Sequence, residues 1–371
     1  MASPGTRDKY RVYIYVHDFF LALLFTLTSL PSSSLLSATQ PGAMSSSTLH
    51  LLLCCCMLVS SFASAASWRT LARMPAGNIH EHSVVALTPT QLVSVGGVLQ
   101  QGGPISSVYL YDLVKDSWKK LASLPVTINH ANVAVVDGKL YVLGGMTGSG
   151  WVGNPTTWLY DQAADKWTTL ASMPASEARG SAVMGVYNKT VWLASGKTKS
   201  GGESVATVSA FDTASGRWLD SIPAKAKNLP EGRDHGGGGI VGTKYYQIAG
   251  SLGPLTNRTD TVFVLDLENL AAGWSRAKGR MPTPRRGFAT ALIGSKFYTF
   301  GGEGNPLASS NGVYSEVEVY DTTTDTWASL GRMPVAKHGS YAVAVNGSIY
   351  IPGGGTASGT PATDIFDVFT P

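Results

Sequence analysis

The chain has 371 residues, with 28 Lys and Arg against 24 Asp and Glu, a formal net charge of +4. Its charged fraction is 14 %, well below the roughly 25 % of an average soluble protein, whereas its hydrophobic fraction is 44 %. Long disorder needs the opposite balance, so it is excluded as the main state. The charge excess is small and no basic run occurs, which argues against a nucleic-acid partner.

Residues 44–65 have the features of a secretory signal peptide. An apolar run, Leu51–Val59, is followed by Ala63-Ser64-Ala65, the small-x-small pattern of a signal-peptidase site. The run is shorter than the roughly 20 apolar residues that cross a membrane, so we expect no stable membrane insertion. We therefore predict a secreted, extracellular protein. The three cysteines all lie in this segment, at 54–56, so residues 66–371 can form neither a disulfide nor a thiolate metal site.

Residues 1–43 form an N-terminal extension of uncertain status. They contain a second apolar run, Phe19–Leu30, preceded by three basic residues. This run is open to three interpretations: a signal peptide in its own right, part of a mispredicted upstream exon, or a membrane anchor. Met44 is a sensible start for the signal peptide that follows, and we favour it as the true start.

An internal repeat of about 50 residues organises the chain from residue 66 to its end. Each repeat has a Tyr-Asp-like pair, a Trp, a Pro and a pair of small residues, usually two glycines. The Trp residues are at 68, 118, 167, 218, 274 and 327, and the small pairs are at 96–97, 144–145, 195–196, 249–250, 301–302 and 353–354. Several markers in register over six repeats indicate one structural unit used six times.

The second repeat predicts four short strands. The first strand, 131–136, is followed by Asp137-Gly138, which favours a type I′ hairpin turn into the second strand, 139–143. After a polar loop, the third strand covers 157–160 and the fourth begins at Lys166. Four strands in about 50 residues form one blade of a β-propeller. The glycines then have a structural role, because innermost strands approach each other closely at the axis.

The double glycine, the Tyr-Asp pair and the Trp seven residues after the Tyr resemble the kelch-repeat family, and the resemblance covers residues 68–371. The chain resumes after the signal peptide with Trp68–Pro75, which reads as a fourth strand, and its last repeat supplies only three strands. We therefore predict an all-β, six-bladed kelch-type β-propeller over 66–371, whose last blade is closed by the N-terminal strand.

Cationic or titratable residues recur 15 to 17 positions before the second small residue of each pair. We predict that they form a ring at one mouth of the central channel and bind an anionic ligand. The alternative is that they are structural, bonding the neighbouring blade. The candidate ring is His82, His130, Arg179, His235, Arg286 and His338. We expect no metal here, on the reasoning that residues spread round a six-fold ring cannot all converge closely on one ion.

The loops after the double glycines share this mouth. Trp151 and Tyr314 lie in them and could stack on a sugar, and Glu303 could act as an acid or a hydrogen-bond acceptor. Three sequons predict N-glycosylation, at Asn188, Asn257 and Asn346.

We predict that the chain is a monomeric binding module without a cofactor, and that its mouth face holds a protein or an anionic or carbohydrate ligand. The alternative is a carbohydrate-active enzyme of the sugar epimerase or lyase type. Galactose oxidase also carries a kelch-type propeller, but that resemblance implies a Tyr cross-linked to a Cys at the copper site. Because residues 66–371 contain no Cys, copper-radical chemistry of that type is excluded. We expect binding rather than catalysis.

Overall fold

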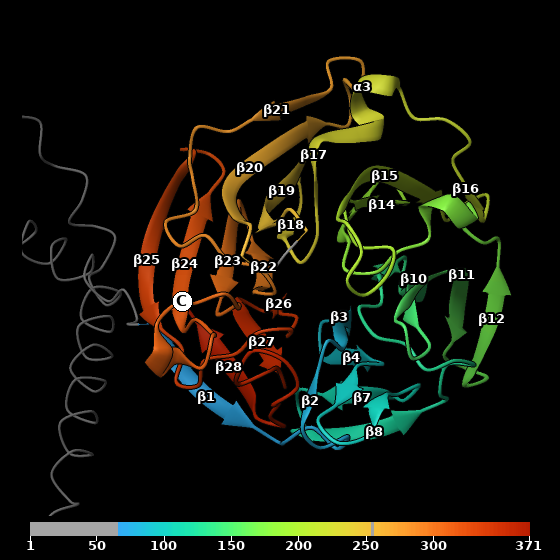
Figure 1. Ribbon diagram of the computed structural model, residues 1–371. Coiled ribbons are helices and arrows are strands. Elements are labelled where there is room, and N and C mark those ends of the chain that lie inside the picture. The colour runs from blue at the N-terminus through green and yellow to red at the C-terminus, as the bar shows by residue number, and fades with distance from the viewer. Residues whose placement is uncertain (1–65, 254–255) are drawn as a thin grey trace, which may run out of the picture. The chain divides into compact units, whose positions relative to one another are not determined.

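The computed structural model describes residues 66–253 and 256–371. These residues form six antiparallel sheets of at least four strands, arranged as blades around a central axis (Figure 1). The all-β propeller predicted from the repeat is therefore confirmed. The predicted signal peptide, 44–65, and the extension, 1–43, lie outside the described residues, so both stay predictions.

Each blade uses consecutive strands in order from the axis to the rim. The first three blades are β3 (Ser83–Thr88), β4 (Gln91–Val95), β7 (Val108–Asp112) and β8 (Ser117–Leu121); β9 (Val133–Val136), β10 (Lys139–Thr147), β11 (Val152–Asp161) and β12 (Lys166–Leu170); and β13 (Val183–Tyr187), β14 (Thr190–Ala194), β15 (Val205–Asp212) and β16 (Arg217–Trp218). The next two are β18 (Gly237–Val241), β19 (Lys244–Ser251), β20 (Arg258–Asp266) and β21 (Trp274–Arg276); and β22 (Ala289–Ile293), β23 (Lys296–Phe300), β24 (Glu316–Asp321) and β25 (Thr326–Arg332).

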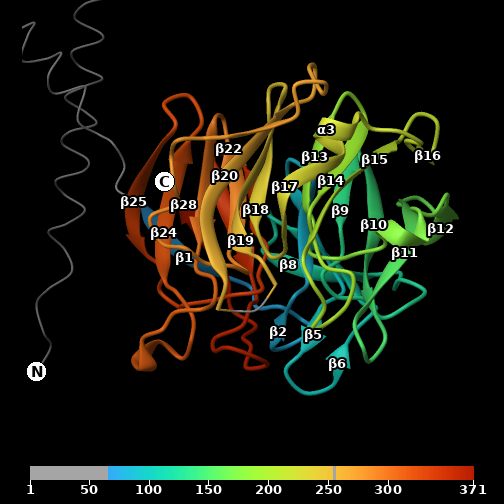
Figure 2. The ribbon, with the colours of Figure 1, turned by 45° about the horizontal axis from the view of Figure 1, so that its top comes forward.

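Several short strands and helices are present in addition to the blade strands. The strands β2 (Ile79–His80), β5 (Val98–Leu99) and β6 (Gly103–Pro104) form a small sheet at one end of the ring, the lower end in Figure 2. The remaining elements are β17 (Asn228–Arg233), which pairs with β15, α3 (Ala224–Lys227), η2 (Ala175–Glu177) and η3 (Ala308–Ser310). None of the helices in the described part of the chain is long and apolar enough to cross a membrane.

The last blade is closed by the N-terminal strand, as predicted. It contains β26 (Val343–Val345), β27 (Ser348–Pro352), β28 (Phe366–Thr370) and β1 (Ser67–Leu71). β1 pairs antiparallel with β28 from Ser67 opposite Thr370 to Leu71 opposite Phe366. Trp68 packs on Phe369 with their ring centroids 4.9 Å apart. The two ends of the propeller are thus joined by a ladder of hydrogen bonds and by apolar packing.

In the first two blades, the Tyr and Trp of the marker, with an Asp two residues before the Trp, tie the blade to the one before it. Tyr160 donates its hydroxyl hydrogen to Asp165 at 2.5 Å, and the same carboxylate accepts the backbone N–H of Ala122 at 2.8 Å. Trp167 Nε1 donates to the carbonyl oxygen of Ala122 at 2.8 Å. Both backbone polar groups of Ala122 in the preceding blade are therefore satisfied, the amide by Asp165 and the carbonyl by the marker residue Trp167. The first blade uses the equivalent Tyr111, Asp116 and Trp118 with Ala72.

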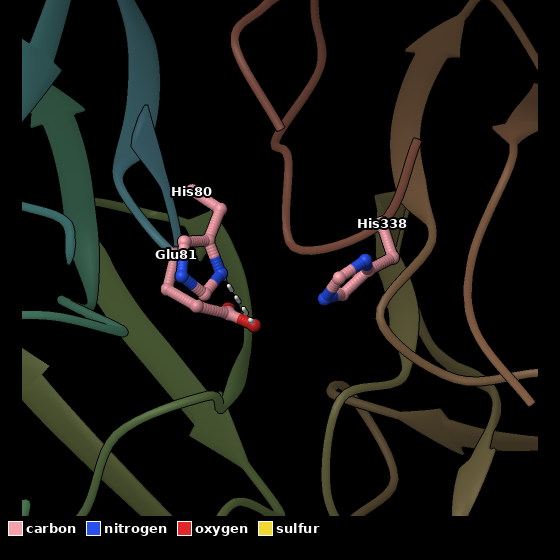
Figure 3. Close-up of side chains that lie close together, drawn as sticks. All are labelled: His80, Glu81 and His338. Atoms are coloured by element: carbon pink, nitrogen blue, oxygen red, sulfur yellow. Dashed lines mark ion pairs between the residues drawn. The ribbon is translucent and has the colours of Figure 1, made fainter. Parts of the chain in front are cut away.

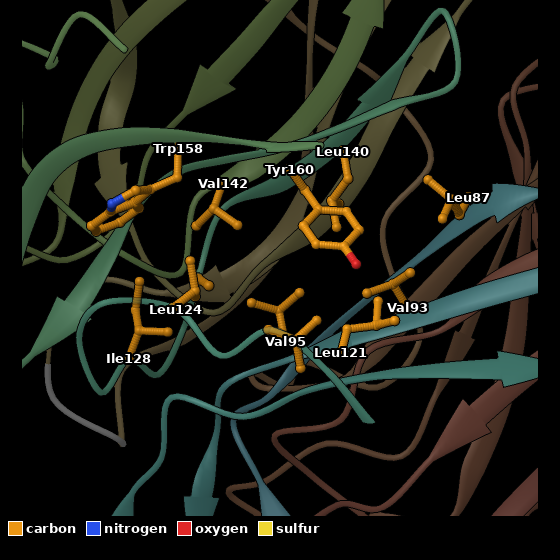
Figure 4. Close-up of a cluster of buried hydrophobic side chains, with 12 residues drawn as sticks. Leu87, Val93, Val95, Leu121, Leu124, Ile128, Leu140, Val142, Trp158 and Tyr160 are labelled. Atoms are coloured by element: carbon orange, nitrogen blue, oxygen red, sulfur yellow. The ribbon is translucent and has the colours of Figure 1, made fainter. Parts of the chain in front are cut away.

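The cores lie between neighbouring blades. The cluster between the first and second blades includes Val93, Leu121, Leu140 and Trp158, all at most 9 % exposed (Figure 4). Burying each such side chain contributes roughly 1.5–3 kcal/mol. The double glycines let backbones of adjacent blades meet. Gly301 has φ +61°, and a Cβ atom there would lie 2.1 Å from the carbonyl oxygen of Lys337, so the predicted structural role of these glycines fits their positions.

Candidate functional site

A ring of six residues, one per blade, closes the propeller around its axis at one face. All six have left-handed backbone conformations, with φ between 50° and 61°. Five of the six amides donate to the carbonyl oxygen of a neighbouring member at 2.6–3.1 Å, and the sixth, His235 N, donates to Ser181 Oγ at 3.0 Å. The hydrogen bonds form a closed circle. We call these residues the axial ring: Glu81, His130, Ser181, His235, Gly287 and Gly339.

A cavity of about 260 Å³ opens at this mouth of the channel. Its walls come from three members of the axial ring, from the residue before the ring position in three blades and from the loops that follow the double glycines. Trp151 forms part of the wall, and its ring lies 5.6 Å from that of His130. The ionisable side chains in the wall are His80, Glu81, His130, Lys197, His235, Arg286, Glu303 and His338.

Three axial-ring side chains converge at the floor of the mouth. Glu81 Oε2 lies 3.0 Å from His130 Nε2, and His130 Nε2 lies 2.9 Å from His235 Nε2. The other ring nitrogen of each imidazole is held by the side chain of the preceding residue. His130 Nδ1 is 2.6 Å from Asn129 Oδ1, and His235 Nδ1 is 2.5 Å from Asp234 Oδ1.

A second group surrounds Arg286. Its Nε donates to Glu303 at 2.8 Å and its Nη1 lies 3.6 Å from Asp234, whereas Nη2 has no partner among the described residues. Glu303 also lies 3.9 Å from His338 Nε2. Figure 3 shows His338 across a gap from His80 and Glu81, with its ring directed toward them. The Glu81–His80 pair is loose, at 4.0 Å.

Burial and charge act against each other on the acidic groups. Burial raises the pKa of Glu81, but the charge and hydrogen bond of His130 outweigh it and hold this pKa well below its usual range. Burial likewise raises the pKa of Asp234, and His235 more than reverses this effect. Burial lowers the pKa of His80. Both carboxyl groups are therefore ionised at neutral pH.

The mouth has more negative than positive formal charge when its imidazoles are neutral. Lys197 and Arg286 contribute two positive charges, whereas Glu81, Asp234 and Glu303 contribute three negative charges, a net of −1. The two nitrogens of His80 lack hydrogen-bond partners although this residue is 3 % exposed. Buried polar groups without partners are uncommon in proteins, and a bound water, ion or ligand is one explanation for them.

The sequence matches the KLHDC2/KLHL20/DRC7 Kelch-repeats domain over residues 64–250 and 238–370. It is also 34 % identical over 329 residues to Kelch-like protein terF of Aspergillus terreus, covering 82 % of this chain and 68 % of that protein. The chain belongs to the kelch-repeat family. The fold agrees, because the solved structure of YjhT superposes with a TM-score of 0.65, covering 81 % of this chain and 97 % of YjhT, at 19 % identity.

Other relatives match only part of the kelch propeller. Kelch-like protein 25 of Xenopus tropicalis is 38 % identical over 80 residues, which span 22 % of this chain and 13 % of that protein. N-acetylneuraminate epimerase of Vibrio cholerae is 35 % identical over 105 residues, which span 28 % of this chain and 26 % of the enzyme. Such partial matches show shared blades.

The kelch propeller does not place the six predicted ring residues at one equivalent position. His130 and His235 belong to the axial ring, and Arg286 and His338 come one residue before it; all four line the mouth cavity. Arg179 comes two residues before Ser181 and is fully buried.

The sequence predicted that His82 and Arg179 belong to the ring at the channel mouth. That prediction is corrected here, because neither residue lines the cavity. Arg179 Nη2 donates to the carbonyl oxygens of Leu193 on β14 at 3.1 Å and Thr207 on β15 at 3.2 Å, so the guanidinium joins strands of its own blade. His82 follows Glu81, is fully buried and does not line the cavity. Burial lowers the pKa of His82 to about 4.

The predicted loop residues separate into two groups. Trp151 and Glu303 line the cavity, whereas Tyr314 is 8 % exposed and packs within its own loop, its hydroxyl 3.4 Å from the carbonyl oxygen of Gly304. All three sequon asparagines are exposed. The first and last are in the hairpins β13–β14 and β26–β27, and the second precedes β20. They are Asn188, Asn257 and Asn346.

Sequence reasoning missed Glu81, His80 and Lys197. A constant spacing of 15 residues before the second glycine of each pair finds the axial ring in five blades, whereas the first blade needs 16. The extra residue in that blade is a bulge in β3, between Ala86 and Thr88. Fixed spacing, rather than a search for similar residue types, would have located Glu81 within one residue.

Proposed function

We propose that this kelch propeller is a secreted protein that binds a carbohydrate of monosaccharide size in its mouth cavity. The observation that carries the proposal is the cavity itself, with buried ionisable side chains in a space of about 260 Å³. This is slightly smaller than the roughly 300–1,000 Å³ of pockets for drug-sized ligands, so it suits a single sugar ring better than a peptide segment.

The wall supplies the contacts that a sugar needs. Hydroxyl groups both donate and accept hydrogen bonds, and the cavity offers carboxylate acceptors at Glu81 and Glu303 together with donors at Lys197 and Arg286. The free Nη2 of Arg286 is placed to bind a carboxylate of an acidic sugar. Trp151 offers an indole face at the rim. This mixture favours a polyhydroxylated ligand over an apolar one.

A ligand-binding experiment tests the proposal. The purified full chain would be titrated calorimetrically with neutral sugars (galactose, N-acetylglucosamine) and acidic sugars (glucuronate, N-acetylneuraminate). We expect at least one sugar to bind, and Arg286→Gln to weaken an acidic ligand about 10- to 100-fold, because a hydrogen bond to a charged group contributes roughly 1.5–3 kcal/mol. Arg332→Gln is the control, because this side chain is 75 % exposed on β25. If no sugar binds, or both variants bind equally well, the proposal fails.

The second candidate function is sugar epimerisation in the same cavity. Two observations favour it: the partial similarity to N-acetylneuraminate epimerase, and the closeness of Glu303 to His338, at 3.9 Å, which places a carboxylate beside an imidazole. Epimerisation needs a general base and a general acid near one carbon of the sugar. Proton NMR of N-acetylneuraminate with the protein would show faster exchange between anomers if the site is catalytic, and unchanged exchange if it only binds.

A further inference from the structure

Three axial-ring side chains meet at the floor of the mouth in an arrangement that a sugar does not explain. We propose that Glu81 Oε2, His130 Nε2 and His235 Nε2 bind one divalent transition-metal ion. One ligand atom from each of these residues lies within 4.8 Å of the other two, and His130 Nε2 is 3.0 Å from Glu81 Oε2 and 2.9 Å from His235 Nε2. An ion about 2.1 Å from each atom, the usual length of a bond from zinc to nitrogen or oxygen, fits between such neighbours.

Both imidazoles are held with the correct nitrogen facing the site. Asn129 Oδ1 and Asp234 Oδ1 accept hydrogen bonds from Nδ1–H of His130 and His235 respectively. In a neutral imidazole the proton on Nδ1 leaves a lone pair on Nε2. Histidines that ligate metals are oriented in this way, by a carboxylate or a carbonyl oxygen on the other ring nitrogen.

With both imidazole protons on Nδ1, the two Nε2 lone pairs meet at 2.9 Å, which is unfavourable unless a metal ion or a proton lies between them. The approach of the Glu81 carboxylate adds a third electron-rich atom at 3.0 Å. A divalent ion removes this repulsion and also changes the charge of the mouth from −1 to +1. A protonated imidazole is the competing explanation, and the experiment distinguishes the two.

The backbone and its neighbours are built around these three side chains. Glu81, His130 and His235 have left-handed backbone conformations that residues other than glycine rarely adopt. In two other blades the axial-ring residue is a glycine. One of these glycines makes room for the carboxylate, because a Cβ atom on Gly339 would lie 2.6 Å from Glu81 Oε1. Asp234 is itself fixed by Ser204 Oγ at 2.5 Å.

The donor atoms identify the class of ion. Two imidazoles and one carboxylate suit Zn²⁺, Fe²⁺ or Co²⁺ better than Mg²⁺ or Ca²⁺, which prefer oxygen ligands alone. Three protein ligands leave a coordination position free, and the cavity of about 260 Å³ lies against these side chains. Sites of this kind accept a water molecule or a ligand at the open position.

A second group of residues shares Glu81. His80, Glu81 and His338 also lie within 4.8 Å of one another, but His80 Nδ1 is 4.0 Å from the carboxylate and neither nitrogen of His80 is oriented by a partner (Figure 3). The triad with His130 and His235 is closer and better oriented. We therefore assign the ion to that triad.

Metal titration of the full chain tests the assignment. The protein would be produced without a histidine tag, treated with a chelator and titrated calorimetrically with Zn²⁺; Co²⁺ would then be added to record its visible absorption bands. We expect one Zn²⁺ per chain with micromolar or tighter affinity. His235→Gln and Glu81→Gln should weaken binding at least 100-fold, whereas His338→Gln, which removes a ligand of the second group, should change it by less than about threefold.

Two results would overturn the proposal. One is a wild-type chain that binds no Zn²⁺ above the buffer control, which would leave a shared proton as the bridge between the imidazoles. The other is a His235→Gln variant that is folded by circular dichroism and binds Zn²⁺ as tightly as wild type. Because metal binding is measured without any sugar, its outcome is independent of the sugar titration.

Discussion

Leu71 tests whether the N-terminal strand closes the ring. It is the last residue of β1, is 7 % exposed and packs between the last blade and the first, in a cluster with Val84, Leu92 and Phe366. Leu121 is its counterpart at the end of β8, is 9 % exposed and packs between the first and second blades. The two strands share the same pattern of burial. They differ in how they are attached: the chain itself connects β8 to its blade, whereas β1 is held to its blade only by hydrogen bonds and packing.

Leu71→Ala should therefore cost as much stability as Leu121→Ala. Replacing a buried leucine by alanine destabilises a protein by about 2–5 kcal/mol, through lost transfer energy and the cavity left behind. Because both positions are nearly fully buried, we expect about 2–4 kcal/mol for each. The two costs should agree within about 1 kcal/mol, since the neighbours in both clusters are branched aliphatic and aromatic side chains.

Urea unfolding followed by tryptophan fluorescence measures both free energies of unfolding. The comparison is made on the full chain, with equal m-values as the check that the same surface is exposed in each variant. If Leu71→Ala costs less than about 0.5 kcal/mol while Leu121→Ala costs at least 2, β1 does not close the ring in solution and the reasoning is refuted.

Three further outcomes are expected. Hydrogen bonding lowers the pKa of Asp165 below its usual 3.8, so its contribution to stability is present above that value and is lost as pH falls through the lower folded pKa; Asp165→Asn should flatten the pH dependence of the urea midpoint between pH 4 and 2, and an unchanged slope would contradict this. Trp167 Nε1 donates a hydrogen bond to Ala122, whereas Trp327 Nε1 has no partner. Trp167→Phe should therefore lower the free energy of unfolding by about 1 kcal/mol more than Trp327→Phe does; equal losses would count against the link between blades. N-terminal sequencing of secreted protein should begin within two residues of Ala66, and a product that retains residues 1–43 would show that the signal-peptide interpretation is wrong.

The architecture was predictable because the repeated marker shows which residues are equivalent in each blade. Six copies of one marker predicted the blades, and the phase of Trp68 against the last repeat predicted the strand that closes the ring. Hydrogen bonds show what the marker Trp does in most blades. Trp167 donates to the carbonyl oxygen of Ala122 in the preceding blade, and Asp165, two residues before it, accepts the amide of Ala122.

The site was less predictable, because it depends on single residues that break the repeat. The bulge in β3 shifted the first blade by one position and hid Glu81. Arg179 was grouped with the histidines by charge, although its burial makes it part of the blade. The six predicted ring residues do not all converge, yet the Nε2 atoms of His130 and His235, two blades apart, lie 2.9 Å from each other, which spacing alone did not predict. Side chains of this length reach across a six-bladed channel.

The central claim is that the mouth cavity is a binding site and not only the place where the blades meet. The most direct test is a crystal structure of the full chain with the tightest-binding sugar of the titrated panel at a saturating concentration. The account predicts the sugar ring inside the cavity, between Trp151 and Arg286, with hydroxyl groups on Glu81 or Glu303. A sugar bound only outside the cavity, or a mouth that contains none at saturation, would contradict it.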